Sequence, residues 1–396
     1  MLPRVKIVFE NGLIGATNPI DDGVAGFLCN GVAVADKLDL NTAYLVTKLE
    51  DLAPLGITSD VDDANKRIYK AVQEFYSEAP VGTKLWIYVV AAVTTMAEML
   101  DKDGTIGKAF VNATNGAVKF VGVIRSVDSE YEATIVDGLD SDVLAAAAKA
   151  QALAEWATEN KYAPFFTILP GLSFSGVPAT LKDLSEYDYN RVGIVIGDTV
   201  ASSADASVGL LCGRIASIPV QRSVARVKSG AIAYTALYIG AVAAENGNPE
   251  VIHDLGYICP RTFVGKAGYF WSDDKLATSP ADDYALIPRR RTIDKASRIA
   301  YATLIEELSD EIAPTSEGKI PAAVCKSLET TVESAIVSGM VGELGTDPDD
   351  QTDKGVKCYI DPDQVVVATS KVNVHLRVKP FGYLKYIDVY LGFLVE

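Results

Sequence analysis

Short apolar runs alternate with amphipathic stretches between about residues 40 and 230. The runs are continuously apolar, as in strands that are covered on both faces. Strands that alternate with helical patterns indicate an α/β sheet with covering helices. The predicted strands are residues 43–46, 85–90, 118–124, 165–169 and 192–196.

Three helices are predicted between these strands. The first begins at Ser59, whose hydroxyl would cap free amides while Asp62 follows three residues later, as in a capping box. Its apolar stripe consists of Val61, Ala64, Ile68, Val72 and Phe75. An alanine-rich segment predicts a second helix over 141–158, and a third is predicted over 204–216.

The pattern changes after residue 221. Many glycines and aromatics over 221–284 leave that region unassigned, whereas 292–312 and 321–340 have apolar residues at helical spacing. An acidic loop is predicted at 345–355, followed by strands at 356–360, 365–368 and 372–378 and a terminal strand at 383–393. We therefore predict a multi-domain α/β (α+β) protein. Its parts are an N-terminal arm (1–20), a core with a variable middle (21–284), a domain with a helix pair and a sheet (285–380) and a C-terminal arm (381–396).

Composition restricts the functional class. The 396 residues carry a formal net charge of −16, so nucleic acid would be repelled overall. Five scattered cysteines form no CxxC pair and predict neither a zinc site nor a disulfide framework. The start has no signal-peptide pattern, and no apolar run reaches about 18 residues, so we expect folding in the cytoplasm without membrane insertion.

No motif for catalysis or cofactor binding is apparent. GxGxxG and the P-loop pattern are absent, and the segment around Ser173 misses the GxSxG spacing by one residue. Only His253 and His375 could act as a histidine base, and the pairs Asp273-Asp274 and Asp282-Asp283 are expected to be solvated. We predict no cofactor and no metal. A hydrolase or transferase of unrecognised type, with Ser173 and His253 at its site, remains the alternative from another class.

Both ends read as strands without features that would block pairing. One is 5–9, and the other is the aromatic run 383–393. Exposed strand edges are templates for pairing, and soluble monomers usually cover them. Either both strands pair within their own subunit, or they are donated to other copies of the chain.

Three segments carry a resemblance to the sheath proteins of contractile phage tails and phage-tail-like injection systems. Residues 204–216 are similar to a small-residue helix that precedes a proline-bearing segment, here 217–220. The arginines at 289–291 resemble the start of the family's C-terminal-domain helix. Residues 372–380 followed by 386–389 resemble its closing strand, proline and final strand.

The resemblance implies a structural polymer without enzymatic activity. Its subunits would form hexameric rings stacked helically around an inner tube protein, with baseplate and tail terminator proteins as further partners. Assembly would take place in the bacterial cytoplasm, and the product would be a phage virion tail or a phage-tail-like particle. Another tail component, such as a tube or baseplate protein, is the structural alternative.

The same resemblance assigns residues to contacts between subunits. The arms would contribute Val5, Ile7, Phe9, Tyr386, Ile387, Val389 and Leu391. The receiving strands would contain Val356, Tyr359, Val372, Val374, Leu376 and Val378. The densest cationic group consists of Arg289, Arg290, Arg291, Lys295 and Arg298; it would face either an acidic tube or the protein's own acidic loops.

Overall fold

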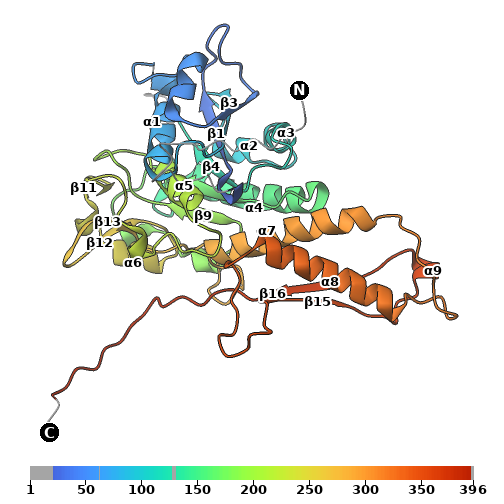
Figure 1. Ribbon diagram of the computed structural model, residues 1–396. Helices are drawn as coiled ribbons and strands as arrows, with labels where there is room; N and C mark the ends of the chain where they lie inside the picture. The colour runs from blue at the N-terminus through green and yellow to red at the C-terminus, as the bar shows by residue number, and fades with distance from the viewer. Residues whose placement is uncertain (1–20, 62, 127–130, 394–396) are drawn as a thin grey trace, which may run out of the picture.

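A six-stranded sheet lies at the centre of the N-terminal part of the chain in the computed structural model, which describes residues 21–61, 63–126 and 131–393 (Figure 1). The strand order is β2-β3-β1-β4-β7-β9; β2 is antiparallel to its neighbour and the other pairs are parallel. The parallel strands follow a doubly wound order. The strands are β1 (Ala25–Gly31), β2 (Ala43–Val46), β3 (Leu85–Ala91), β4 (Phe120–Ile124), β7 (Phe166–Pro170) and β9 (Val192–Val195).

Helices cover both faces of this sheet. Neighbouring residues of β1 point to opposite sides: Phe27 packs edge-on against Phe75 of α1, while the α-carbon of Gly26 lies against Phe110 of α3. The face of Phe27 is covered by α1 (Asp63–Glu78) and α5 (Val208–Ser217). Helices α2 (Met96–Met99), α3 (Ile106–Ala113) and α4 (Ser141–Lys161) form the other layer. Most of the buried apolar side chains belong to this one core.

The contact between α1 and α5 depends on two glycines. A Cβ atom on Gly209 would lie 2.3 Å from the carbonyl oxygen of Ala71, and one on Gly213 would lie 2.4 Å from that of Phe75. Since these glycines are four residues apart, they occupy one face of α5. They allow the two helix backbones to touch, which explains the small-residue character of this segment.

Short elements lie between the strands of the sheet and between the sheet and the C-terminal part. They include the region that the sequence left unassigned, which forms two small antiparallel pairs, β10–β11 and β12–β13, and a short helix. The short elements are β5 (Ile135–Val136), β6 (Leu139–Asp140), β8 (Asp188–Tyr189), β10 (Tyr238–Ile239), β11 (Val242–Ala243), α6 (Pro249–Asp254), β12 (Pro260–Phe263), β13 (Lys266–Trp271) and β14 (Ala277–Thr278).

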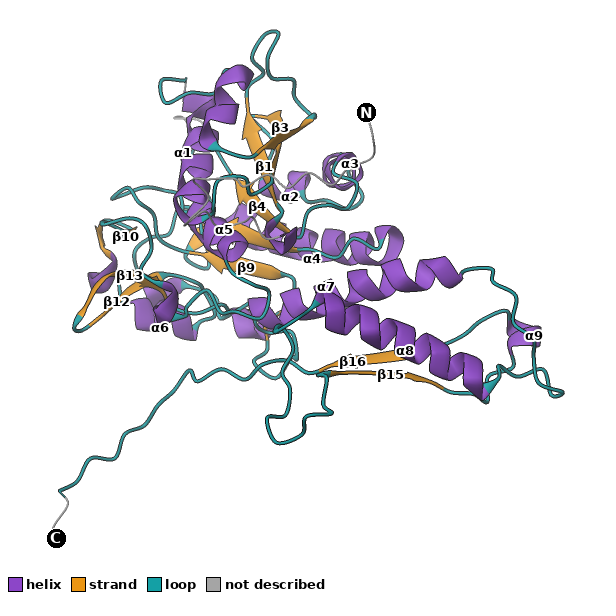
Figure 2. Cartoon of the chain, in the orientation of Figure 1, coloured by secondary structure: helices purple, strands orange, loops and turns teal. Residues whose placement is uncertain are grey.

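Two long helices and a two-stranded sheet form the C-terminal part (Figure 2). Helix α7 (Ile287–Leu304) packs beside α8 (Ala322–Gly339), and α8 covers one face of β15 (Val356–Ile360), which pairs antiparallel with β16 (Val374–Val378). A short helix, α9 (Val366–Thr369), precedes β16. A separate apolar cluster lies between α7, α8 and the β15–β16 sheet. It contains Ala296, Val332, Ile336, Met340 and Cys358.

The structure confirms the α/β class and corrects several predicted elements. The central strand β1 was not predicted, and the first helix begins at Asp63, because the Ser59 hydroxyl bonds to Asp60 instead of capping a helix. Helix α7 starts five residues before the predicted position, with Pro288 in its first turn, where a missing N–H costs nothing. It ends at Leu304, before Glu306 and Glu307, whose negative charges are unfavourable at a helix C-terminus. Residues 365–368, predicted as a strand, belong mostly to α9.

Within the described ranges, no helix is both long and apolar enough to cross a membrane. The five cysteine thiols are free and buried, and burial raises the pKa of Cys29 and Cys212 well above the ordinary thiol value.

Candidate assembly surfaces

The C-terminal arm runs away from the body of the protein in an extended conformation (Figure 1). From Leu384 to Phe393 it carries seven large apolar or aromatic side chains with high exposure; Tyr390 is 94% and Leu391 96% exposed. Arm residues 381–393 contain no strand paired with another described residue. Such an apolar segment is the kind of surface that a partner normally covers. The predicted N-terminal arm residues Val5, Ile7 and Phe9 lie outside the described residues.

Two contacts fix the root of the C-terminal arm to the body. The Tyr383 hydroxyl donates a hydrogen bond to the carbonyl oxygen of Gln221 at 2.6 Å. The Lys385 ammonium lies 2.5 Å from Oδ1 of Asp273 and 3.3 Å from Oδ1 of Asp274. The arm therefore becomes free only after Lys385.

The two aspartates that hold Lys385 are buried, although the sequence predicted solvated carboxylates. Asp273 also meets Nε2 of His253 at 3.1 Å. Burial raises the pKa of Asp274, and its Oδ2 has no hydrogen-bond partner among the described residues. Asp273 instead has a lowered pKa: burial opposes this shift, but the hydrogen bond from His253 and the charge of Lys385 outweigh it. This cluster of Asp273, Asp274 and His253 therefore holds the Lys385 ammonium of the arm against the body of the protein.

The strands predicted to receive an arm form one small sheet. Its inner face carries Val356, Cys358 and Ile360 of β15, and Val374, Leu376 and Val378 of β16. Tyr359 points outward, where its ring stacks on His375 of the other strand. Val372 precedes β16 and is not part of the strand. Whether this sheet receives an arm stays a prediction.

The cationic group on α7 does not form an exposed surface. Arg290 and Arg291 are buried, and Arg289 is half-buried. Asp294 accepts hydrogen bonds from Arg290 at 2.6 Å and from Arg191 at 3.0 Å. Burial of these guanidinium groups within the subunit argues against a tube contact through Arg290 and Arg291, and the tube-facing role of the group stays a prediction.

Arg291, Lys295 and Arg298 connect α7 to other parts of the chain. Arg291 donates to the carbonyl oxygen of Ile218, and Arg298 donates to those of Gly116 and Val118. Lys295 bridges carboxylate oxygens of Asp22 at 2.5 Å and Glu343 at 2.6 Å. Burial lowers the pKa of Arg291 and of Arg298 to about 10, so both remain charged at neutral pH. Helix α7 is thus fastened by charged hydrogen bonds to loops around the central sheet.

The residues of the alternative hydrolytic site have other partners. The two ring nitrogens of His253 face carboxylates, Asp254 at 2.9 Å and Asp273 at 3.1 Å, so neither nitrogen faces Ser173. The backbone N–H of Ser173 donates to the carbonyl oxygen of Ala204. This arrangement does not form a nucleophile–base pair.

In a doubly wound sheet, ligands usually bind where the strand order reverses, at the carboxyl ends of the strands. At that place Asn30, at the end of β1, donates to the carbonyl oxygens of Ala92 and Ser126 at 2.7 and 2.8 Å. Arg125, after β4, donates to the carbonyl oxygen of Thr94 at 2.6 Å. Protein side chains therefore link the loops at this end of the sheet.

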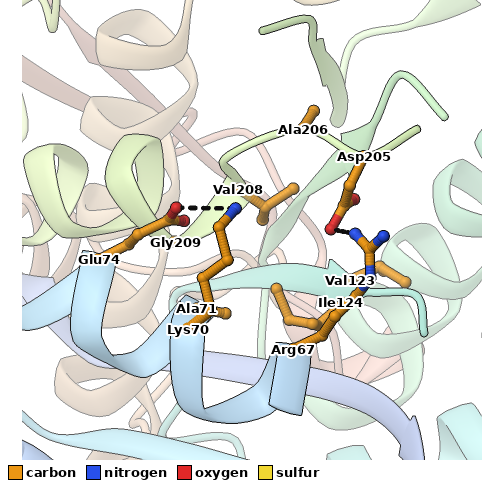
Figure 3. A pocket seen from close by; sticks show the side chains of 10 residues that line it. All are labelled: Arg67, Lys70, Ala71, Glu74, Val123, Ile124, Asp205, Ala206, Val208 and Gly209. Carbon is orange, nitrogen blue, oxygen red and sulfur yellow. Dashed lines mark ion pairs between the residues drawn. The ribbon is translucent and has the colours of Figure 1, made fainter. Parts of the chain in front are cut away.

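A narrow pocket between α1, α5 and β4 is lined by ion pairs (Figure 3). Arg67 pairs with Asp205, and Lys70 lies 3.1 Å from Glu74. Glu74 also accepts a hydrogen bond from the Ser207 hydroxyl at 3.0 Å. Burial raises the pKa of Glu74. These contacts join α1 to the start of α5.

The fold is that of contractile-tail sheath proteins. The anti-feeding prophage helical sheath in its contracted state superposes with a TM-score of 0.64 at 14% identity, over 100% of this chain and 99% of that one. The sheath complex of the extracellular contractile injection system PVC, also contracted, gives 0.60 at 12% identity over 99% and 97%. The sheath tail protein Lin1278 of Listeria innocua gives 0.50 at 10% identity over 90% and 95%.

The sequence family is defined separately. The DUF2586 N-terminal domain model matches residues 2–275, and the DUF2586 C-terminal domain model matches residues 283–396. The chain belongs to the DUF2586 family. No curated protein matches its sequence.

Proposed function

We propose that this protein is the structural subunit of a contractile tail sheath. Copies polymerise helically around an inner tube and contract to drive that tube through a membrane. The observation that carries this proposal is the likeness to sheath proteins over the full chain, together with an exposed apolar arm fixed at its root. The role is mechanical and requires neither catalysis nor a cofactor.

The partners follow from this role. The first is the chain itself, in hexameric rings that stack into the helical polymer. The inner tube, the baseplate and the tail terminator complete the particle, and assembly takes place in the bacterial cytoplasm. A similar chain was determined within the baseplate of the anti-feeding prophage, which supports a baseplate contact.

We further propose the division into arms (1–20 and 381–396), core (21–284) and C-terminal domain (285–380). In this scheme the arms add strands to the β15–β16 sheets of neighbouring copies. Main-chain hydrogen bonds would then connect the copies and persist while the bodies reorient.

Electron microscopy of purified protein tests the function. Full-length protein should form striated hollow cylinders, and a variant without residues 384–396 should remain folded and monomeric. Circular dichroism and size-exclusion chromatography of that variant separate failed assembly from failed folding. A full-length protein that stays monomeric at high concentration would contradict the proposal.

A further inference from the structure

Three ionisable side chains meet in one buried place at the root of the C-terminal arm. Nζ of Lys385 lies 2.5 Å from Oδ1 of Asp273 and 3.3 Å from Oδ1 of Asp274. Asp273 is 4% exposed, and Asp274 is fully buried. A single ammonium group thus faces two carboxyl groups from which water is largely excluded. An amine and a carboxyl group that are held together in this way can condense to an amide.

The amine nitrogen is within reach of the carboxyl carbon of Asp273. Because Nζ of Lys385 lies 2.5 Å from Oδ1 and the C–O bond adds about 1.2 Å, Nζ and Cγ cannot be more than about 4 Å apart. Reacting atoms in a productive arrangement lie about 3 to 3.5 Å apart. The hydrogen bond from Tyr383 to Gln221 holds the chain two residues before Lys385. A small movement of one side chain is therefore enough to bring the two atoms together.

Two hydrogen-bonding groups polarise the Asp273 carboxyl group. The backbone N–H of Asp274 donates to Oδ1 at 2.8 Å, and Nε2 of His253 lies 3.1 Å from Oδ2. Nδ1 of His253 faces Asp254 at 2.9 Å, so the ring lies between two carboxylates and in its charged form donates to both. Donors to both oxygens stabilise the negative charge that develops when an amine attacks Cγ. Asp273 is therefore the better electrophile of the two aspartates.

Asp274 is placed to accept the proton that Lys385 must lose. Only the neutral amine attacks, because an ammonium group has no free electron pair. Burial raises the pKa of Asp274, so its carboxylate accepts a proton more readily than an exposed one. Burial lowers the pKa of Lys385, but the charges of Asp274 and Asp273 outweigh it and raise that pKa, so the ammonium form predominates. We therefore expect a slow reaction.

We propose that Lys385 and Asp273 form an intramolecular isopeptide bond, with Asp274 as the acid–base catalyst. Nζ of Lys385 gives one proton to Asp274 and attacks Cγ of Asp273. The Nζ–Cγ bond forms, and the Cγ–Oδ2 bond breaks. Oδ2 leaves as water with the two protons that the ammonium group loses, one of which Asp274 returns. The condensation needs no oxidant, reductant or further reactant, and the Lys385 side chain, 27% exposed, leaves the water a way out.

The bond joins the arm covalently to the body of its own subunit. The ion pair between Lys385 and Asp273 is the state before the bond forms. Because both residues belong to one chain, the reaction takes place in a monomer and does not depend on assembly. In a sheath, where the arms connect the copies, a covalent root would keep the arm attached under load.

Intact-mass spectrometry of the denatured full-length chain tests the bond. Wild type stored at neutral pH should be lighter than its sequence by about 18 Da, the mass of one water. Lys385→Arg keeps the positive charge but removes the nucleophile, because a guanidinium group stays protonated, and should keep its full mass. Lys371→Arg, at an exposed lysine, is the matched control and should lose water as wild type does. Full mass in wild type, or loss of water in Lys385→Arg, would overturn the proposal.

Peptide mapping locates the bond. Trypsin does not cleave after an acylated lysine, and Pro380 blocks cleavage after Lys379. The product should therefore be a branched peptide that joins residues 267–275 to residues 378–396. A loss of water that maps to other residues would contradict the proposed pair.

Asp274→Asn tests the catalyst. The amide cannot take up the proton, so the fraction of reacted chain at fixed times after synthesis should indicate a rate at least about 100-fold lower. Circular dichroism of this variant shows whether it is folded. An unchanged rate in the folded variant would show that Asp274 is not the catalyst. The mass does not depend on polymer formation, so a missing bond and a missing sheath are separate observations.

Discussion

The Nζ atom of Lys385 lies 2.5 Å from Oδ1 of Asp273, a residue 112 positions earlier in the chain. Among the described residues, this ion pair is the last polar contact of the arm with its own body before the exposed segment begins. The ion pair therefore fixes the position at which the arm leaves the body of the protein.

Replacing Lys385 by methionine should detach the root of the arm and leave two buried carboxylates without their cation. We expect a loss of about 2 kcal/mol in the free energy of unfolding, below the usual cost of a fully buried pair because the lysine is partly exposed. Urea denaturation measures this loss. Lys371→Met, which removes an exposed lysine, is the control, and equal stability of the two variants would contradict the anchoring role.

The buried carboxyl of Asp274 should make stability depend on pH. Its raised pKa means that the folded state holds the proton more tightly than the unfolded state, so this contribution is present at low pH and is lost as pH rises through the folded value, about 6. Relative to wild type, Asp274→Asn should therefore gain about 1.4 kcal/mol in free energy of unfolding between pH 5 and pH 8. Denaturation of both proteins at the two pH values checks this. A constant difference would argue against the raised pKa.

Asp294 neutralises two buried arginines, Arg191 and Arg290. Asp294→Asn should destabilise the protein by about 4 kcal/mol, since it leaves both guanidinium groups without a counter-ion. Thermal unfolding would show the loss, and Asp349→Asn in the acidic loop should leave the midpoint unchanged. The idea fails if the two substitutions have the same effect.

The substitution Gly213→Ala compares the gain in helix propensity with the loss of close packing between α1 and α5. Propensity alone predicts a gain of about 1 kcal/mol in a helix. The new Cβ would lie 2.4 Å from the carbonyl oxygen of Phe75, so we expect α1 and α5 to move apart at a net cost of about 2 kcal/mol. Gly382→Ala, with no atom within 4 Å of the new Cβ, serves as the control. A stabilised Gly213→Ala protein would show that the helices are not in direct contact.

Local sequence patterns predicted the strands that are covered on both faces, because continuous burial leaves a continuous apolar run. They missed β1, which contains Gly26, Asn30 and Gly31, residues that disfavour strands unless tertiary contacts hold them. Here Gly26 makes room for Phe110 and the Asn30 amide links two loops.

The contacts at the candidate surfaces depend on residues that are distant in sequence. Asp273 and Asp274 resemble a solvated loop until Lys385 is placed beside them. Glu329 and Glu333 read as the polar face of a helix, although they cap the edge of β15. The arginines of α7 looked like an exposed patch because their acceptors are mostly backbone carbonyls, which leave no trace in a sequence.

The anchoring of Lys385 also limits the spacing of neighbouring bodies in the proposed polymer. Asp388 lies only three positions beyond Lys385, a reach of about 11 Å when fully extended. Adding one strand spacing, a receiving strand that pairs with the arm at Asp388 must lie within about 16 Å of the donor's Lys385. Because the linking segment is so short, it allows little relative movement, and a rotation of one body would pull directly on the small sheet of the next copy.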